Sequence, residues 1–195
     1  MVRPLLAPRL RQSCQRLVLG ATMVEMLMVM AIAGSVLAMA LPSMGAMVSS
    51  QKAVSTVNLF LASLHFTRGE AIKRNGRAVM CKSADHQQCT TSGSWEQGWV
   101  VFHDLNNNAR VDAGEAVIQQ QTGASSGLVL RGNGPVASYV SYTPSGSAKL
   151  MSGAFQAGTF TLCPGNSGGP ADIRKVILGG PGRPRLQKGT SADCS

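Results

Sequence analysis

The chain has 195 residues and a formal net charge of +9 at pH 7, with 44% hydrophobic and 14% charged residues. This length suits one compact domain with an additional anchoring segment rather than several domains. Four arginines lie in the first 20 positions, and without them the net charge falls to +5 (9 − 4). The total charge alone therefore does not indicate a nucleic-acid-binding protein.

The N-terminal region combines a basic leader with a long apolar run. From Ala21 to Leu41 the only charged side chain is Glu25. About 20 apolar residues match, as a helix, the thickness of the hydrocarbon core of a bilayer. We therefore predict a leader over 1–20 that is cleaved and a transmembrane segment over 21–41. The leader arginines favour an orientation with the N-terminus in the cytoplasm.

Glu25 requires an explanation, because a charge inside a membrane segment costs about 2.5–3.5 kcal/mol on insertion scales. Cleavage after Gly20 would free an α-amino group at Ala21, and this amine could neutralise Glu25 of a neighbouring subunit. A basic leader, Gly, and an apolar span with Glu in fifth place resemble the leader of type IV pilins and pseudopilins. The resemblance implies that prepilin peptidase cuts after Gly20 and methylates the new terminus. Ala21 departs from the family, which usually has Phe or Met there.

Two other interpretations of this region remain open. Ala38-Met39-Ala40 fits the cleavage pattern of an ordinary secretory signal, and the mature chain would then start at Leu41. The apolar run could also be a plain membrane anchor. Neither interpretation explains the spacing of Gly20 and Glu25, so we favour the pilin-type leader.

A helical pattern continues beyond the apolar run. Pro42 predicts a kink. Apolar residues then recur at three- and four-residue steps, and polar residues occupy the opposite face of the predicted helix. The apolar residues are Met44, Met47, Val48, Val54, Val57, Leu61, Leu64 and Ile72. We predict one helix from about Ala21 to Arg74. Its second half, over 42–76, packs on a globular head and ends at Asn75-Gly76.

Residues 77–195 are predicted to form a β head. Segments rich in Val, Ile, Leu, Tyr and Phe alternate with turn residues, and the predicted strands are 77–81, 98–102, 116–119, 127–131, 138–142, 159–163 and 172–178. The segments 165–171 and 179–185 are rich in Gly and Pro and are predicted to be irregular. The predicted fold class is α+β, a long N-terminal helix packed on an antiparallel β-sheet head.

The cysteines indicate an oxidising compartment. Cys14 lies in the leader, which leaves Cys81, Cys89, Cys163 and Cys194, an even set suited to the periplasm or the cell surface. Three pairings are possible, and we favour Cys81 with Cys89 and Cys163 with Cys194. The spacing lacks paired Cys-x-x-Cys motifs, so it does not indicate a zinc site.

Four short motifs mark the head. They are Trp99-Val100-Val101-Phe102-x-Asp104-x-Asn106-x-Asn108, Asp112-x-Gly114-Glu115, Tyr142-Thr143-Pro144-Ser145-Gly146 and Phe160-Thr161-Leu162-Cys163. Together they resemble the GspH/FimT family of minor pseudopilins. The resemblance implies a non-enzymatic subunit that assembles with other pilin or pseudopilin subunits in a type IV pilus or a type II secretion system. It also implies a single pass through the inner membrane, with the head in the periplasm or on a pilus.

One acidic segment matches a calcium-loop pattern. Asp104, Asn106, Asn108, Asp112 and Glu115 occupy its first, third, fifth, ninth and twelfth positions. However, Ala109 stands where the sharp turn normally needs Gly, and the flanking segments are predicted strands rather than helices. We therefore favour a hairpin loop closed by its own hydrogen bonds, with calcium as the alternative and no other cofactor.

The C-terminal tail carries a net charge of +3 over 164–195, and its basic residues are Arg174, Lys175, Arg183, Arg185 and Lys188. Gly182-Arg183-Pro184-Arg185 matches a Gly-Arg-x-Arg motif that DNA-binding members of the FimT group use in natural transformation. Arginines on a Gly/Pro backbone can follow a phosphate chain. We predict an exposed loop that binds double-stranded DNA without sequence preference; the alternative is a secretion pseudopilin with no DNA binding.

Gly165-Asn166-Ser167-Gly168-Gly169-Pro170 resembles the nucleophile segment of trypsin-like serine proteases. That chemistry needs a His base oriented by an Asp. Neither His65 nor His103 has the surrounding motif of those proteases. A Gly-rich loop is therefore favoured over a secreted hydrolase.

Overall fold

The computed structural model describes residues 20, 22–123, 127–165 and 173–194, without the side chains of 39–44 and 46. Helix α1 (Met23–Lys73) starts in one compact unit, residues 1–41, and continues into a second, residues 42–195. These bounds confirm the predicted helix to within two residues at its start and one at its end.

The end of α1 has the predicted form. Asn75 adopts a positive φ of 48°, a conformation that Asn tolerates better than most residues. Its backbone N–H donates to the Ile72 carbonyl at 3.2 Å, and the Gly76 N–H donates to the Ala71 carbonyl at 3.2 Å. The last turn of the helix is therefore closed, and the chain turns into the first strand.

Eight strands within the described residues form two antiparallel sheets of four. In spatial order, the first sheet consists of β3 (Val117–Thr122), β2 (Gly98–His103), β1 (Ala78–Lys82) and β5 (Tyr139–Tyr142), and the second of β4 (Leu128–Gly132), β6 (Gly158–Pro164), β7 (Arg174–Leu178) and β8 (Pro184–Lys188). The described part of the chain also has three 3-10 helices, η1 (Trp95–Gln97), η2 (Gly134–Val136) and η3 (Ser191–Cys194), which connect or follow the strands.

Two predictions about the head are corrected. All seven predicted strands exist with shifted ends, but they belong to two sheets instead of one. The segment 179–185 is not irregular throughout, because Pro184 begins an eighth strand, β8, at the edge of the second sheet. Proline is compatible with the first position of an edge strand, where no ladder hydrogen bond is lost.

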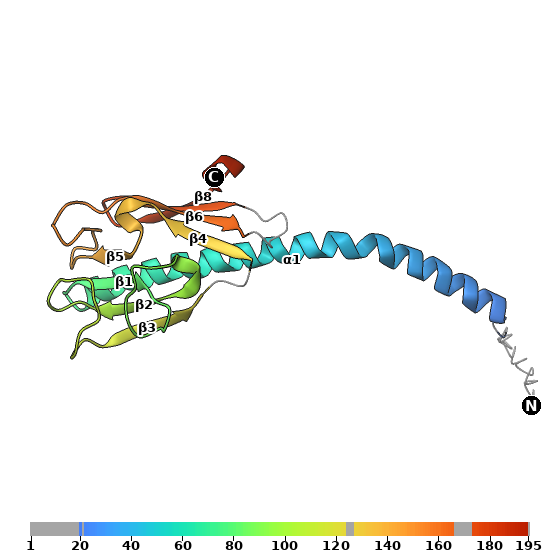
Figure 1. Ribbon diagram of the computed structural model, residues 1–195, viewed down its shortest axis with the longest axis horizontal. Helices are drawn as coiled ribbons and strands as arrows, with labels where there is room; N and C mark the ends of the chain where they lie inside the picture. Colours follow the sequence, from blue (N-terminus) through green and yellow to red (C-terminus); the bar gives the residue numbers. More distant parts are fainter. Residues whose placement is uncertain (1–19, 21, 124–126, 166–172, 195) are drawn as a thin grey trace, which may run out of the picture. The chain divides into compact units, whose positions relative to one another are not determined.

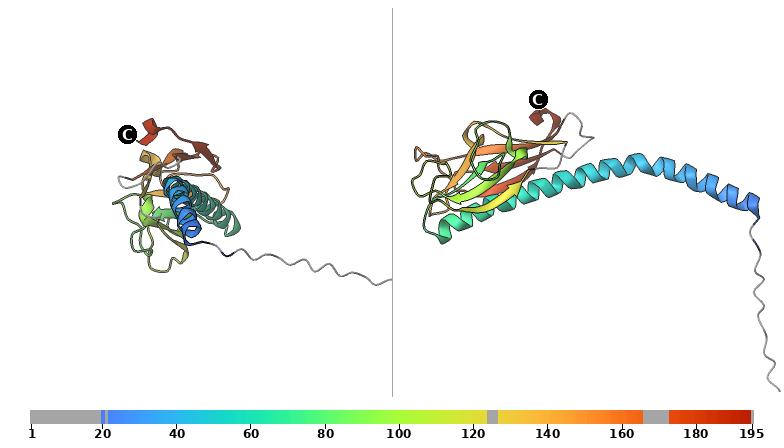
Figure 2. Two further views of the ribbon diagram at one scale, coloured as in Figure 1. Left: turned by 90° about the vertical axis from the view of Figure 1, so that its right-hand side faces the viewer. Right: turned by 60° about the horizontal axis from the view of Figure 1, so that its bottom comes forward.

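The second half of α1 lies along the strands and shares one core with both sheets (Figures 1 and 2). Phe60 of α1 is fully buried. Its ring centroid lies 5.4 Å from Trp95, 5.1 Å from Trp99 on β2 and 4.7 Å from Phe160 on β6, all in edge-to-face geometry. One helical side chain therefore joins the two sheets.

The first sheet is also covered on its other face. Val79, Cys81, Val100 and Phe102 form a second buried apolar cluster there, against which Cys89, Ala109, Val111, Val117, Tyr139 and Met151 pack. All five residues of β1 are buried, so neither face of this strand is exposed to water. The loops that follow β1 and β2 are held against this outer face.

Candidate functional site

The start of α1 presents Glu25 in its first turn. The Glu25 backbone N–H donates to Thr22 Oγ1 at 3.3 Å, and the Met26 N–H donates to the Thr22 carbonyl at 3.2 Å, so Thr22 caps the helix. The position of Glu25 also suits the partial positive charge of a helix N-terminus. Gly20 is exposed, and Ala21 lies outside the described residues.

The first half of α1 exposes apolar surface. Every large apolar side chain described from Met23 to Leu37 is more than half exposed in the single chain, including Leu27, Val29 and Ile32. Contiguous apolar exposure of this kind is typical of a surface that another molecule covers. Within the described residues, no helix has an apolar stretch long enough to cross a membrane.

The favoured cysteine pairing is confirmed. Cys81 is bonded to Cys89, which closes the loop after β1, and Cys163 of β6 is bonded to Cys194 of η3. The second bond ties the end of the chain to the second sheet. The tail after β7 is therefore an edge strand and a short helical turn, not the exposed loop that the sequence predicted.

The acidic segment between β2 and β3 forms a hydrogen-bonded loop. The buried Asp104 accepts the backbone N–H groups of Asn108 and Ala109 at 3.1 and 3.0 Å. Glu115 accepts the N–H groups of Leu105 and Asp112 at 2.7 and 3.2 Å. Each of these carboxylates therefore already has donors within the loop.

Asp112 is bound in a similar way. The side-chain amides of Asn106 and Asn108 both donate to Asp112 Oδ2, at 2.8 and 2.6 Å, and these bonds lower the pKa of Asp112. Ala109 has φ of 58°, the conformation for which Gly was expected. Among the described residues, no three His, Cys, Asp or Glu side chains are grouped as metal ligands. Calcium binding stays a prediction.

The predicted DNA-binding residues do not form one continuous strip. In the antiparallel pair of β7 and β8, Ile177 lies opposite Arg185 and Arg174 lies opposite Lys188. Alternate residues of a strand face opposite sides of its sheet, and Val176 is buried in the core. Lys175 and Arg185 therefore share the outer face of the second sheet, whereas Arg174 and Lys188 lie on the opposite side.

Arg183 precedes β8 in a turn that glycine makes possible. Gly182 is buried with φ of 78°, and a Cβ there would overlap the backbone oxygen of Gly146. Pro184 is also buried, whereas Arg183 and Arg185 are exposed. In this four-residue motif, Gly182 and Pro184 therefore shape the chain, and the two arginines face solvent.

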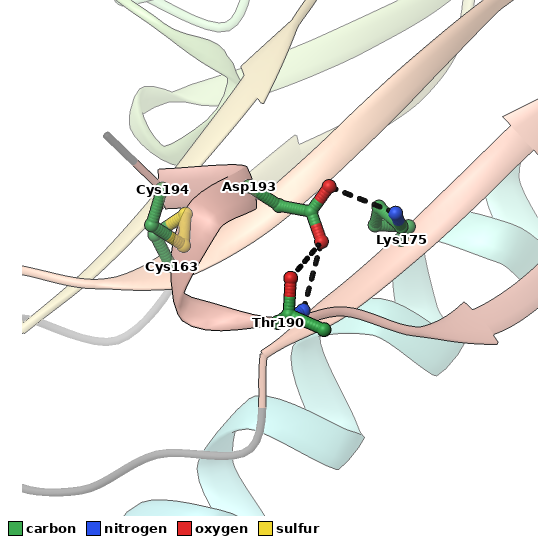
Figure 3. A network of polar contacts seen from close by, with 5 residues as sticks. All are labelled: Cys163, Lys175, Thr190, Asp193 and Cys194. Carbon is green, nitrogen blue, oxygen red and sulfur yellow. Dashed lines mark hydrogen bonds and ion pairs between the residues drawn. A yellow bond between two sulfur atoms is a disulfide. The ribbon is translucent and has the colours of Figure 1, made fainter.

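Lys175 is engaged by the end of the chain (Figure 3). Its Nζ donates to Asp193 Oδ1 at 2.8 Å, while Asp193 Oδ2 accepts the backbone N–H and the hydroxyl of Thr190 at 2.8 and 3.0 Å. The Lys175 bond, with the Thr190 N–H, lowers the pKa of Asp193 to about 2. Of the five basic residues predicted for the tail, Lys175 is thus partly neutralised.

One basic residue that no sequence motif singles out lies beside Lys175 in the fold. Arg131 of β4 lies opposite Thr161 of β6, and Thr161 lies opposite Lys175 of β7. A hollow of about 390 Å³ opens over this row. The two cations are 44 positions apart in the chain (175 − 131), so only the strand order could reveal their proximity.

The protease-like segment gives no catalytic constellation in the part of the chain that the structure describes. Ser167 lies outside that part. His65 is exposed on α1, and Asp104, next to His103, is bonded to the loop N–H groups.

The chain matches a known protein family and is similar to solved structures of minor pilins and pseudopilins. Residues 56–182 match the family described as Type II transport protein GspH. No curated protein sequence matches the chain. Among solved structures, the type IV minor pilin FimU of Pseudomonas aeruginosa is 17% identical with a TM-score of 0.52, over 73% of this chain and 91% of FimU. The minor pseudopilin EpsH of the Vibrio cholerae type 2 secretion system is 17% identical with a TM-score of 0.47, over 70% of this chain and 97% of EpsH.

Proposed function

The chain belongs to the GspH family of minor pseudopilins, and on this basis we propose that it is a structural subunit, not an enzyme, of a type IV pilus or a type II secretion pseudopilus. The family match covers residues 56–182, which include the last part of α1, from residue 56 to Lys73, and seven of the eight described strands. Its partners in this role are other pilin or pseudopilin subunits.

We propose that the first half of α1 anchors and assembles the subunit. Prepilin peptidase would cut after Gly20, and the segment 21–41 would sit in the inner membrane with the head in the periplasm. The exposed apolar side chains of α1 support this role, because they would be covered by lipid and by neighbouring helices. Glu25, in the first turn, would pair with the α-amino group of Ala21 on a neighbouring subunit.

The mass of the native N-terminal peptide tests this proposal. We expect protein isolated from its own cell envelope to begin at Ala21 and to carry a methyl group on its amine. A mature start at Leu41 would instead indicate an ordinary signal peptide, and an uncut leader would indicate a plain anchor. Either of these results would contradict the pilin-type role.

We propose DNA binding at the head as a second function. The supporting observation is that Arg183 and Arg185 are exposed, and within the described residues neither side chain has a hydrogen bond or ion pair. Gly182 and Pro184 hold the segment in shape, so the two guanidinium groups can reach a phosphate backbone without reorganising the chain. The alternative is a subunit that serves protein secretion and does not bind DNA.

A gel-shift assay distinguishes these alternatives. The full chain in detergent should shift a short duplex at low salt, and Arg183→Ala with Arg185→Ala should remove the shift. If each arginine contacts one phosphate, binding by the wild type should weaken with salt as expected for at least about two phosphate contacts. Arg110→Ala, a change at an exposed arginine of the β2–β3 loop, serves as the control and should bind as wild type does. Unchanged binding by the double variant would refute this second function.

A further inference from the structure

The outer face of the second sheet carries a cationic hollow. Arg131, Thr161 and Lys175 lie opposite one another on three neighbouring strands. Adjacent strands are about 4.8 Å apart, so the backbones of Arg131 and Lys175 are separated by about 10 Å with Thr161 between them. The hollow over this row is also lined by Asn133, Thr159, Asp193 and the Cys163–Cys194 bond.

The donors of this hollow suit an oxyanion. Arg131 is exposed, and its side chain has no hydrogen bond or ion pair to any other described residue. A guanidinium offers paired N–H donors to an anion, and a lysine ammonium adds a compact charge. The Thr161 hydroxyl, placed between the two cations, can donate a third hydrogen bond. The row therefore presents several donors on one open face.

An anion from the chain itself already occupies part of the hollow. Asp193 reaches in from η3 and binds Lys175 at 2.8 Å, as Figure 3 shows. The Cys163–Cys194 bond holds η3 beside β6, and a tethered group competes at a high effective concentration. Asp193 does not pair with Arg131, so one cation of the hollow stays available while the other is neutralised.

From these contacts we propose that the hollow between Arg131 and Lys175 is a phosphate-binding site in which Asp193 acts as an intramolecular competitor. A tetrahedral phosphate has enough oxygens to accept from both cations and from Thr161, whereas the two oxygens of Asp193 serve only Lys175 and Thr190. The site does not include Arg183 or Arg185. It therefore stands even if the tail does not bind DNA.

Titration with inorganic phosphate tests the site. The full chain in detergent, with its disulfides intact, is titrated at constant ionic strength by calorimetry. Asp193→Asn keeps the shape of the side chain and removes the competing charge, so it should raise the affinity for phosphate at least about threefold. Arg131→Gln with Lys175→Gln should abolish saturable binding, and the unfolding midpoint of each variant shows whether it is folded.

A charge-matched control separates competition in the hollow from a general change in net charge. Asp112→Asn removes one negative charge in the β2–β3 loop, away from the residues that line the hollow, and should change the affinity much less than Asp193→Asn does. The proposal fails if Asp193→Asn binds phosphate no more tightly than wild type. It also fails if Asp112→Asn has the same effect as Asp193→Asn, or if folded Arg131→Gln with Lys175→Gln still binds phosphate.

A second titration identifies the source of the phosphate. If a short DNA duplex also binds Asp193→Asn more tightly than wild type, and free phosphate displaces it, the site takes backbone phosphates. If only inorganic phosphate responds, the site takes the free ion. Both results support a phosphate site. A wild-type failure to shift DNA, combined with phosphate binding by Asp193→Asn, would refute DNA binding but leave this site established.

Discussion

Phe60 is the residue through which the helix and both sheets share a core, since its ring contacts Trp95, Trp99 and Phe160. Phe60→Ala should lower the free energy of unfolding of the head by about 3–5 kcal/mol, because it removes buried area and leaves a cavity. Phe66→Ala on the same helix is the matched control, since Phe66 is 39% exposed, and it should cost less than half as much. Chemical denaturation of the full chain in detergent, followed by tryptophan fluorescence, measures both. Equal losses would contradict this description of the core.

Asp193 gives the C-terminal turn a dependence on pH. Its pKa is lowered to about 2 by Lys175 and Thr190, below the value of 3.8 for the free group. A carboxyl whose folded pKa is lowered stabilises the fold above its unfolded pKa, and this contribution is lost as the pH falls from about 4 to about 2. Wild type should therefore lose more stability than Asp193→Asn between pH 5 and pH 2. Denaturant unfolding at the two pH values measures the difference, and equal losses would show that the Lys175 contact contributes nothing.

At the scale of elements, the loop between β2 and β3 should not depend on a cation. Its three carboxylates accept hydrogen bonds from backbone N–H groups or asparagine amides. These bonds hold the loop in its conformation, as a calcium ion would in a metal-binding loop. The thermal unfolding midpoint of the protein should differ by less than about 2 °C between millimolar calcium and EDTA. A loop that does not bind calcium gains no stability from it. A clear rise of the midpoint with calcium would instead favour the calcium alternative for Asp104 and its neighbours.

The elements differ in how well the sequence predicts them. The strands around Val79, Val100 and Phe160 are apolar and flanked by turn residues, so their existence follows from composition. β8 was missed because Arg185, Gln187 and Lys188 are polar and the preceding Gly/Pro segment resembles a loop. An edge strand has little core contact, so its formation depends on pairing with β7, which the sequence does not reveal.

In the candidate site, too, the sequence does not reveal contacts that depend on the pairing of strands. The arginine motif and the acidic loop were found from local sequence patterns, and the observed cysteine pairing was the favoured one of the three that the sequence allows. Arg131 was not, because its relation to Lys175 arises from the strand order β4–β6–β7. The division into two sheets was also missed, since both faces of β1 are buried and its residues show no alternation.

At the scale of the whole molecule, the proposed assembly surface and the proposed ligand surfaces lie in different parts of the sequence. Glu25 and the exposed apolar side chains belong to the unit of residues 1–41, whereas Arg131, Lys175, Arg183 and Arg185 belong to the unit of residues 42–195. No residue is shared between the two sets. Assembly and ligand binding should therefore be separable by mutation.

Glu25→Ala should abolish filament assembly while leaving DNA and phosphate binding by the purified chain unchanged. The substitution removes the proposed partner of the Ala21 amine, and a charge left unpaired in an apolar surrounding is strongly destabilising, so we expect at least a tenfold loss of assembled subunits. Ser35→Ala, an exposed position ten residues further along α1, is the control and should assemble. Sheared filaments or secretion measure assembly, and the N-terminal mass confirms that processing is intact. Normal assembly of correctly processed Glu25→Ala would remove the role of this carboxylate, and a parallel loss of DNA binding would contradict the separation of the two surfaces.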